Sequence, residues 1–84
     1  MEVVFLKEGW EDYLYWQTHD KKILKKINNL IKDIQRNPIT GIGSPEALKH
    51  GLSGYWSRRI TLEHRLIYMA RDNQVRVLQC RYHY

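Results

Sequence analysis

The chain has 84 residues and carries 14 Lys and Arg against nine Asp and Glu, a formal net charge of +5. A chain this short supports a single small core, so we predict one domain over residues 1–84. Hydrophobic residues make up 43% of the sequence, which argues against a disordered chain. Solubility is the plainest reason for the positive charge, and a nucleic-acid partner is the next, ahead of a membrane.

Membrane insertion and a disulfide scaffold are not expected. The sequence has no run of about 18 apolar residues for a membrane span, and no N-terminal stretch resembles a signal peptide. The single cysteine, Cys80, cannot form an internal disulfide. The four histidines show no metal-ligand spacing such as H-E-x-x-H. We therefore expect a cytoplasmic protein that needs no metal and no cofactor.

The N-terminal half predicts a strand followed by two helices. Residues 2–7 contain the β-favouring run Val3-Val4-Phe5-Leu6. From Trp10 the apolar spacing becomes that of a helix of about three turns. Asp20 is placed to cap a second helix, and Pro38 ends it because a proline disfavours a helical conformation of the residue before it. The apolar stripe of this second helix is Ile23, Ile27, Leu30, Ile31 and Ile34.

The C-terminal half predicts an irregular segment followed by three strands. Residues 38–54 hold four of the five glycines and both prolines, so regular structure is not expected there. Residues 55–60, 65–70 and 75–83 predict strands, and the short links between them predict antiparallel pairing. The order β-α-α-β-β-β predicts an α+β domain, with a helical hairpin packed on one face of a small antiparallel sheet.

Alternation along the strands sorts the side chains of this sheet into two faces. The face beneath the helices is expected to hold Leu66, Tyr68, Leu78 and Cys80. The opposite face is expected to hold Arg59, Arg65, Arg81 and His83. Such a basic face is suited to RNA, and its arginines fit an ordinary solvated sheet surface equally well.

Several segments of the chain closely match one known family. They are Glu-Asp-Tyr-Leu-Tyr-Trp (11–16), Lys-Lys-Ile-Asn (25–28), Leu-Lys-His (48–50), Leu-Ser-Gly-Tyr-Trp-Ser-Arg-Arg-Ile-Thr (52–61), Glu-His-Arg-Leu (63–66) and Cys-Arg-Tyr-His-Tyr (80–84). Over nearly its whole length the chain resembles the YoeB toxins of the RelE/ParE superfamily. The resemblance implies a microbial-ribonuclease-like fold, cleavage of messenger RNA in the ribosomal A site, and silencing by an acidic antitoxin of the YefM kind. It leaves a homodimer open.

The resemblance also identifies candidate site residues. The family's catalytic glutamate, arginine, histidine and terminal tyrosine match Glu46, Arg65, His83 and Tyr84, and its RNA-binding cations match Lys49 and Arg59. RNA carries its own nucleophile, the ribose 2′-hydroxyl, so its cleavage needs a base, an acid and cations but no metal. We assign the base to Glu46, the acid to His83 and the holding of the phosphate to Arg65. Tyr84 is expected to position a nucleotide by stacking or hydrogen bonding.

The same residues also fit roles without catalysis. Without the resemblance, Glu46 and Lys49 are ordinary solvated loop residues, and His83 belongs to a frayed terminus. A non-catalytic module that binds nucleic acid, or a ParE-like poison of DNA gyrase, is the alternative function. Residues 39–44 depart from the family pattern, which can alter how Glu46 is presented.

The assigned chemistry makes a prediction about the last hairpin, because Arg65 and His83 must lie on the same face. A two-residue turn at Asp72-Asn73 pairs Arg71 with Gln74. Continued without interruption, that register places the two catalytic side chains on opposite faces. We therefore predict either an odd number of loop residues or a β-bulge that restores the parity.

Overall fold

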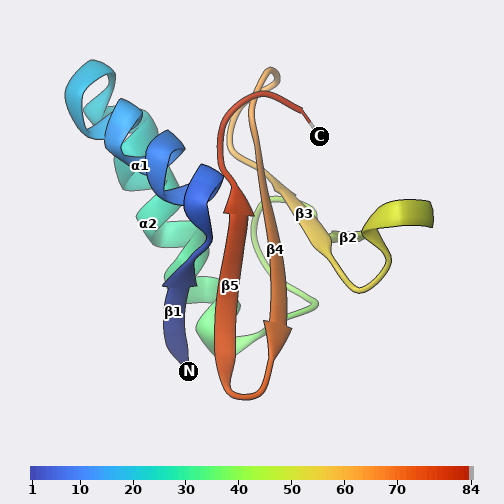
Figure 1. Ribbon diagram of the computed structural model, residues 1–84. Helices are drawn as coiled ribbons and strands as arrows, with labels where there is room; N and C mark the ends of the chain where they lie inside the picture. The colour runs from blue at the N-terminus through green and yellow to red at the C-terminus, as the bar shows by residue number, and fades with distance from the viewer. Residues whose placement is uncertain (84) are drawn as a thin grey trace.

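The computed structural model describes residues 1–83. Its elements are β1 (Glu2–Phe5), α1 (Lys7–His19), α2 (Lys21–Arg36), β2 (Glu46–Ala47), the 3-10 turn η1 (His50–Leu52), β3 (Trp56–Arg59), β4 (Arg65–Arg71) and β5 (Gln74–Gln79). The strands form one sheet in the order β1-β5-β4-β3-β2, and the two helices pack beside it as a hairpin (Figure 1). The predicted α+β fold is confirmed.

The antiparallel pairing predicted from the short links is confirmed for β3–β4 and β4–β5, but the sheet is not antiparallel throughout, which corrects that part of the fold prediction. β1 lies parallel to β5, with Val3 opposite Val75, whereas the β2–β3, β3–β4 and β4–β5 pairs are antiparallel. The strand at residues 2–7 had no short link to any other strand, so the sequence held no signal for its direction. The long path through α1, α2 and the antiparallel strands brings β5 beside β1 in the same direction.

Local capping chemistry explains the ends of α2, but it does not explain the start of α1. The α1 N-cap is Leu6, which makes no side-chain capping bond. Asp20 caps α2 as predicted, because its Oδ1 accepts from the backbone N–H groups of Lys22 and Ile23 at 3.0 and 3.2 Å. The helix ends at Arg36, two residues before Pro38. Most of its apolar stripe enters a core with sheet residues; the fully buried members are Ile27, Leu30, Ile34, Leu66, Tyr68, Val75, Val77 and Cys80.

The β4–β5 hairpin contains the bulge that was predicted from the parity of the register. Asp72 and Asn73 form a two-residue turn in which φ is 54° and 59°, the positive values that such tight hairpin turns need. Arg71 pairs with Gln74 across this turn. The register then shifts between Ile67 and Tyr68, where β5 contributes one extra residue. The predicted bulge is confirmed.

The bulge changes which β5 side chains lie beneath the helices. Tyr68 pairs with Val77, and Ile67 pairs with Gln79, so Leu78 is the extra residue. Val77 is buried in the core, where strict alternation along β5 predicted Leu78. That prediction was wrong because the extra residue at the bulge shifts the alternation by one position. Cys80, beyond the bulge, is fully buried as predicted.

The chain after Gln79 is not a strand, although residues 75–83 were expected to form one. Arg81 lies with its guanidinium carbon 3.5 Å from the centre of the Tyr15 ring in α1. Stacking on an aromatic face therefore draws this arginine to the helix side. Its predicted place on the basic face was wrong.

Residues 37–45 are irregular, as expected, but they are firmly held. The buried Arg58 side chain donates to the carboxylate of Asp33 in α2 and to the Tyr68 hydroxyl. It also donates to three backbone carbonyls of the segment, those of Asn37, Thr40 and Ile42. Gly43, at φ 80°, accepts from the Arg59 N–H, and an added Cβ there would meet Leu30 at 2.8 Å. Within the predicted irregular segment 38–54, the departures are β2, which begins at Glu46 and pairs with β3, and the 3-10 turn η1.

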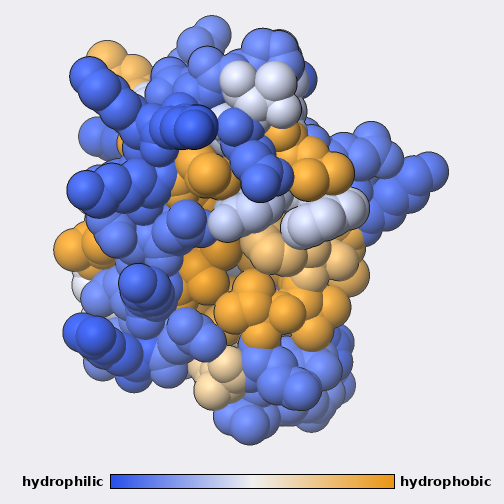
Figure 2. Space-filling view, turned by 90° about the vertical axis from the view of Figure 1, so that its left-hand side faces the viewer, coloured by the Kyte–Doolittle hydropathy of each residue, from blue (hydrophilic) through white to orange (hydrophobic). Residues whose placement is uncertain are grey.

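Some apolar side chains remain exposed on the side of β1 and the helices. Val3, Trp10 and Leu14 are 38%, 47% and 40% exposed. Figure 2 shows this side of the molecule, with hydrophobic surface lying between hydrophilic areas. Within residues 1–83, neither helix is long and apolar enough to cross a membrane.

Candidate functional site

The candidate site is built on the sheet face opposite the helices. Cross-strand partners share a face, so Glu46, Ser57, Ile67 and Gln79 form one row across β2, β3, β4 and β5. Ser57 and Ile67 are fully buried within this row. Two residues further along β3 the next row begins, in which Arg59 and Arg65 are direct partners. The prediction that these two arginines share one face is confirmed.

Arg65 is held on this face by contacts with two neighbouring side chains. Its Nε donates to the Ser57 hydroxyl, and its Nη2 lies 3.7 Å from Oε2 of Glu46. The Arg65 side chain is only 14% exposed, whereas that of Glu46 is 66% exposed. The ion pair is therefore open to solvent on one side and contributes little to stability. The contact with Ser57 orients the guanidinium and leaves its outer N–H groups free to bind a phosphate.

Lys49 follows the edge strand β2 and lines the same surface hollow as Glu46. Together with Ala47, Leu48 and His50, these two residues line a surface hollow of about 290 Å³. Both charged side chains are exposed, while Leu48 between them is buried and its N–H donates to the Tyr55 carbonyl at 3.0 Å. The edge strand β2 and the residues after it thus present a carboxylate, Glu46, and a cation, Lys49, to solvent.

The chain beyond β5 is held first by α1. The Cys80 N–H donates to Oδ2 of Asp12 at 3.0 Å, and the Cys80 carbonyl accepts from the Trp16 indole at 2.8 Å. Burial raises the pKa of the Asp12 carboxyl, although the Cys80 N–H and the charge of Arg81 act in the opposite direction. Burial also raises the pKa of the Cys80 thiol to about 12, so this cysteine is an inert core residue.

The next residues turn back over the start of β4, as Figure 1 shows. Tyr82 has a φ of 60°; its N–H donates to Nδ1 of His64 at 2.7 Å and its carbonyl accepts from the Arg65 N–H at 3.0 Å. The His83 carbonyl then accepts from the Gln79 side-chain amide at 2.7 Å. His83 itself is exposed. Tyr84 lies outside the described residues.

These contacts place Glu46 and the backbone of His83 on two sides of Arg65. Glu46 and Gln79 lie at the two ends of one row, three strand spacings or about 14 Å apart at the level of the backbone. The backbone of His83 is attached at the Gln79 end. Arg65, on the strand between them, contacts Glu46 through its side chain and Tyr82 through its N–H.

Sequence reasoning missed two residues that support this site. Ser57 was available from the alternation that placed Arg59 on the open face, since the two are two residues apart on one strand. His64 had no such signal, because its role depends on a chain reversal at Tyr82 that no pattern in the sequence announces.

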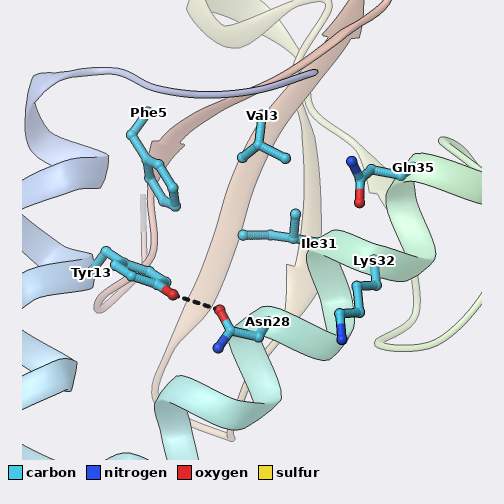
Figure 3. Close-up of a pocket in the computed structure, with 7 residues that line it drawn as sticks. All are labelled: Val3, Phe5, Tyr13, Asn28, Ile31, Lys32 and Gln35. Atoms are coloured by element: carbon cyan, nitrogen blue, oxygen red, sulfur yellow. Dashed lines mark hydrogen bonds between the residues drawn. The ribbon is translucent and has the colours of Figure 1, made fainter. Parts of the chain in front are cut away.

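Two further features lie outside this group. No cluster of three His, Cys, Asp or Glu side chains suited to a metal occurs among residues 1–83. On the helix side, Figure 3 shows a hollow of about 370 Å³ between β1, α1 and α2, in which the Tyr13 hydroxyl donates to Asn28 at 2.7 Å. None of its lining residues is a predicted site residue.

Comparison with known proteins gives consistent matches. Residues 5–84 match the family model described as the YoeB-like toxin of the bacterial type II toxin–antitoxin system. Toxin YoeB of Escherichia coli K12 is 58% identical over 84 residues, which is all of both chains. A YoeB/ParE toxin structure from Agrobacterium tumefaciens has a TM-score of 0.96 at 45% identity, again over all of both chains. The toxin in a YoeB–YefM complex from Staphylococcus aureus has a TM-score of 0.93 at 49% identity, covering 100% of this chain and 98% of that one.

The fold and these matches define the class of protein: a toxin of a bacterial type II toxin–antitoxin system. Within that class, the chain belongs to the YoeB toxin family, as the resemblance in its motifs implied.

Proposed function

We propose that this chain is a metal-independent endoribonuclease that cleaves messenger RNA in the ribosomal A site and so inhibits translation. The observation that carries the proposal is the setting of Arg65. This arginine is oriented by Ser57, lies beside Arg59 and faces the Glu46 carboxylate at 3.7 Å. An arginine that can hold a phosphate next to an exposed carboxylate is what attack by a ribose hydroxyl requires.

The proposed reaction is a transphosphorylation. The Glu46 carboxylate removes the proton of the ribose 2′-hydroxyl, and the 2′-oxygen forms a bond to phosphorus. The bond from phosphorus to the 5′-oxygen of the next nucleotide breaks, and the His83 imidazolium gives that oxygen a proton. The products are a 2′,3′-cyclic phosphate and a 5′-hydroxyl. Arg65 donates to the non-bridging oxygens, where negative charge accumulates.

The remaining candidate residues are proposed to bind and orient the substrate. Lys49 and Arg59 are both exposed and add positive potential along the RNA backbone. Tyr84 is assigned a positioning role on the resemblance alone. It directly follows the proposed acid, His83, in the sequence.

The partner is proposed to be an acidic antitoxin of the YefM kind, by analogy with the Staphylococcus aureus complex. A net charge of +5 favours association with such a segment, and covering the basic face blocks RNA. A YoeB dimer from the same organism, 50% identical to this chain, supports a homodimer as the free form. A toxin that acts on ribosomes works in the cytoplasm.

Cleavage of ribosome-bound and naked messenger RNA by the purified protein tests the proposal. We expect strand breaks on programmed ribosomes, and we expect Glu46→Gln and His83→Gln to lower the rate by about 10²–10⁴-fold, the usual contribution of an acid or base. Both side chains are exposed, so the variants should remain folded. RNA binding without cleavage by the wild-type protein would instead support the non-catalytic binding module.

A further inference from the structure

We propose that His64 is a positioning residue, which holds the C-terminal segment of residues 80–83 so that His83 can reach the leaving group. This inference rests on the proposed function, because His83 is the assigned acid. His64 itself is almost fully buried, at 7% exposure, and its side chain points to the backbone of Tyr82 rather than to the open face.

The donor and the acceptor of the hydrogen bond between Tyr82 and His64 are fixed by chemistry. The Tyr82 amide can only donate, so Nδ1 of His64, 2.7 Å away, must accept and carry no proton. The ring proton therefore lies on Nε2, which is 3.4 Å from a carboxylate oxygen of Glu63. The neighbouring residue Arg65 makes the second hydrogen bond to the Tyr82 backbone, since its N–H donates to the Tyr82 carbonyl at 3.0 Å.

The ring of His64 is itself held in place on several sides. It packs edge-on against Trp16, with ring centres 4.7 Å apart, and lies 5.5 Å from the Tyr82 ring. The His64 N–H donates to the Thr61 hydroxyl at 3.0 Å, and the His64 carbonyl accepts from the N–H groups of Ile60 and Thr61. The acceptor Nδ1 is therefore presented from a rigid turn.

The conformation of Tyr82 depends on these two hydrogen bonds to its backbone. Its φ of 60° is a left-handed conformation that a tyrosine adopts only at a cost, so other contacts must maintain it. The reversal at Tyr82 carries the chain back to Gln79, which binds the His83 carbonyl. Without the His64 contact, the Tyr82 amide loses its partner and the chain is free to relax to an extended conformation. His83 would then move away from Arg65.

Two substitutions separate positioning from packing. In His64→Asn the side-chain oxygen is bonded to Cγ, as Nδ1 is in histidine, so it can accept from Tyr82. In His64→Gln the oxygen is one bond further out, where Nε2 lies. Glutamine fills more of the space beside Trp16 than asparagine does. A role in packing alone therefore predicts that glutamine is tolerated better, whereas positioning predicts the opposite.

The experiment is steady-state cleavage of ribosome-bound messenger RNA, with kcat and KM measured separately. We expect His64→Gln to lower kcat by roughly 10–100-fold, the scale of a small misplacement of a catalytic group. KM should stay nearly constant, because Arg59 and Lys49 are untouched. His64→Asn should recover most of the rate. His19→Asn is the matched control, since His19 is exposed at the end of α1, and it should behave as the wild type.

Hydrogen exchange of the Tyr82 amide supplies a readout that does not depend on cleavage. We expect slow exchange in the wild type and His64→Asn, and fast exchange in His64→Gln, with the core amides of β4 unchanged. A glutamine variant with wild-type kcat, or with a protected Tyr82 amide, overturns the proposal. So does an asparagine variant as impaired as the glutamine one. A wild-type protein that cleaves no RNA refutes the proposed ribonuclease, while the exchange data still decide whether His64 holds the segment.

Discussion

At the residue scale, Arg58 in β3 and Arg65 in β4 are the same type of residue but face opposite sides of the sheet and have different roles. Arg58 faces the helices and directs its donors to Asp33, Tyr68 and backbone carbonyls, so it fixes the fold. Arg65 faces the other way and uses its Nε on Ser57, which leaves its outer nitrogens toward Glu46 and solvent. Alternation along a strand predicts this division, but it does not predict which carbonyls Arg58 will find.

Ser57→Ala tests the orientation of Arg65. Removing the hydroxyl frees the guanidinium to rotate, and we expect kcat for RNA cleavage to fall by about tenfold or more, as misorientation of a phosphate-binding group does. Cleavage kinetics together with thermal melting will separate this effect from unfolding. Ser53→Ala is the control, because Ser53 is exposed and bonds only to the His50 carbonyl within η1. Equal rates for both variants would mean that Ser57 does not position Arg65.

Asp33→Asn tests the partly exposed ion pair between Asp33 and Arg58 through its pH dependence. The hydrogen bond from Arg58, together with one from the Ile42 N–H, lowers the pKa of the Asp33 carboxyl below its ordinary value of 3.8. A lowered pKa stabilises the folded state above 3.8, and this contribution is lost as the pH falls through the folded-state value. Denaturant unfolding should therefore show wild type more stable than Asp33→Asn at about pH 7, with the gap closing well below about pH 4. A constant gap would contradict the pairing.

At the element scale, the packing of α1 on β5 is unusually close at Gly9. A Cβ at this position would come closer to the Val77 carbonyl oxygen than two nonbonded atoms can approach. Alanine ordinarily favours a helix over glycine by about 1 kcal/mol. Here we expect Gly9→Ala to destabilise the protein by about 1–3 kcal/mol, because the helix must move off the strand.

Denaturant titration measures this effect directly. The control is Gly51→Ala, since an added Cβ at Gly51 meets nothing within 4 Å. We expect that variant to stay near the wild-type free energy of unfolding. A stabilised Gly9→Ala would show that α1 does not sit against β5 as described.

The elements also show where prediction from the sequence succeeds. The helix stripe and the Asp20 cap depend on local spacing, and the structure confirms both. A bulge could be predicted because the proposed chemistry places Arg65 and His83 on one face. Its position at Leu78 could not be predicted from the sequence. The end of β5 at Gln79 and the stacking of Arg81 on Tyr15 depend on tertiary contacts. The alternation of side chains along a strand does not predict such contacts.

At the scale of the whole molecule, the basic face predicts how RNA binding responds to salt. Each phosphate contact to single-stranded RNA contributes about 0.7 to the slope of log affinity against log salt. In a Glu46→Gln background that prevents cleavage, we expect Lys49→Ala and Arg59→Ala each to weaken binding and to reduce this slope by about that amount. The control is Lys21→Ala at the start of α2, on the helix side, which should leave the slope unchanged. Equal effects of all three would indicate binding by net charge alone.

The most direct test of the proposed chemistry uses a messenger RNA with one 2′-deoxyribose on the 5′ side of the scissile bond. The proposed mechanism requires that 2′-hydroxyl as the nucleophile, because the roles proposed for Glu46, Arg65 and His83 are those of a base, a cation and an acid, and none of them is an attacking group. We expect the all-ribose message on the ribosome to yield a 2′,3′-cyclic phosphate and a 5′-hydroxyl, and the substituted message to stay intact at that bond. Cleavage of the deoxy-substituted bond would contradict the mechanism.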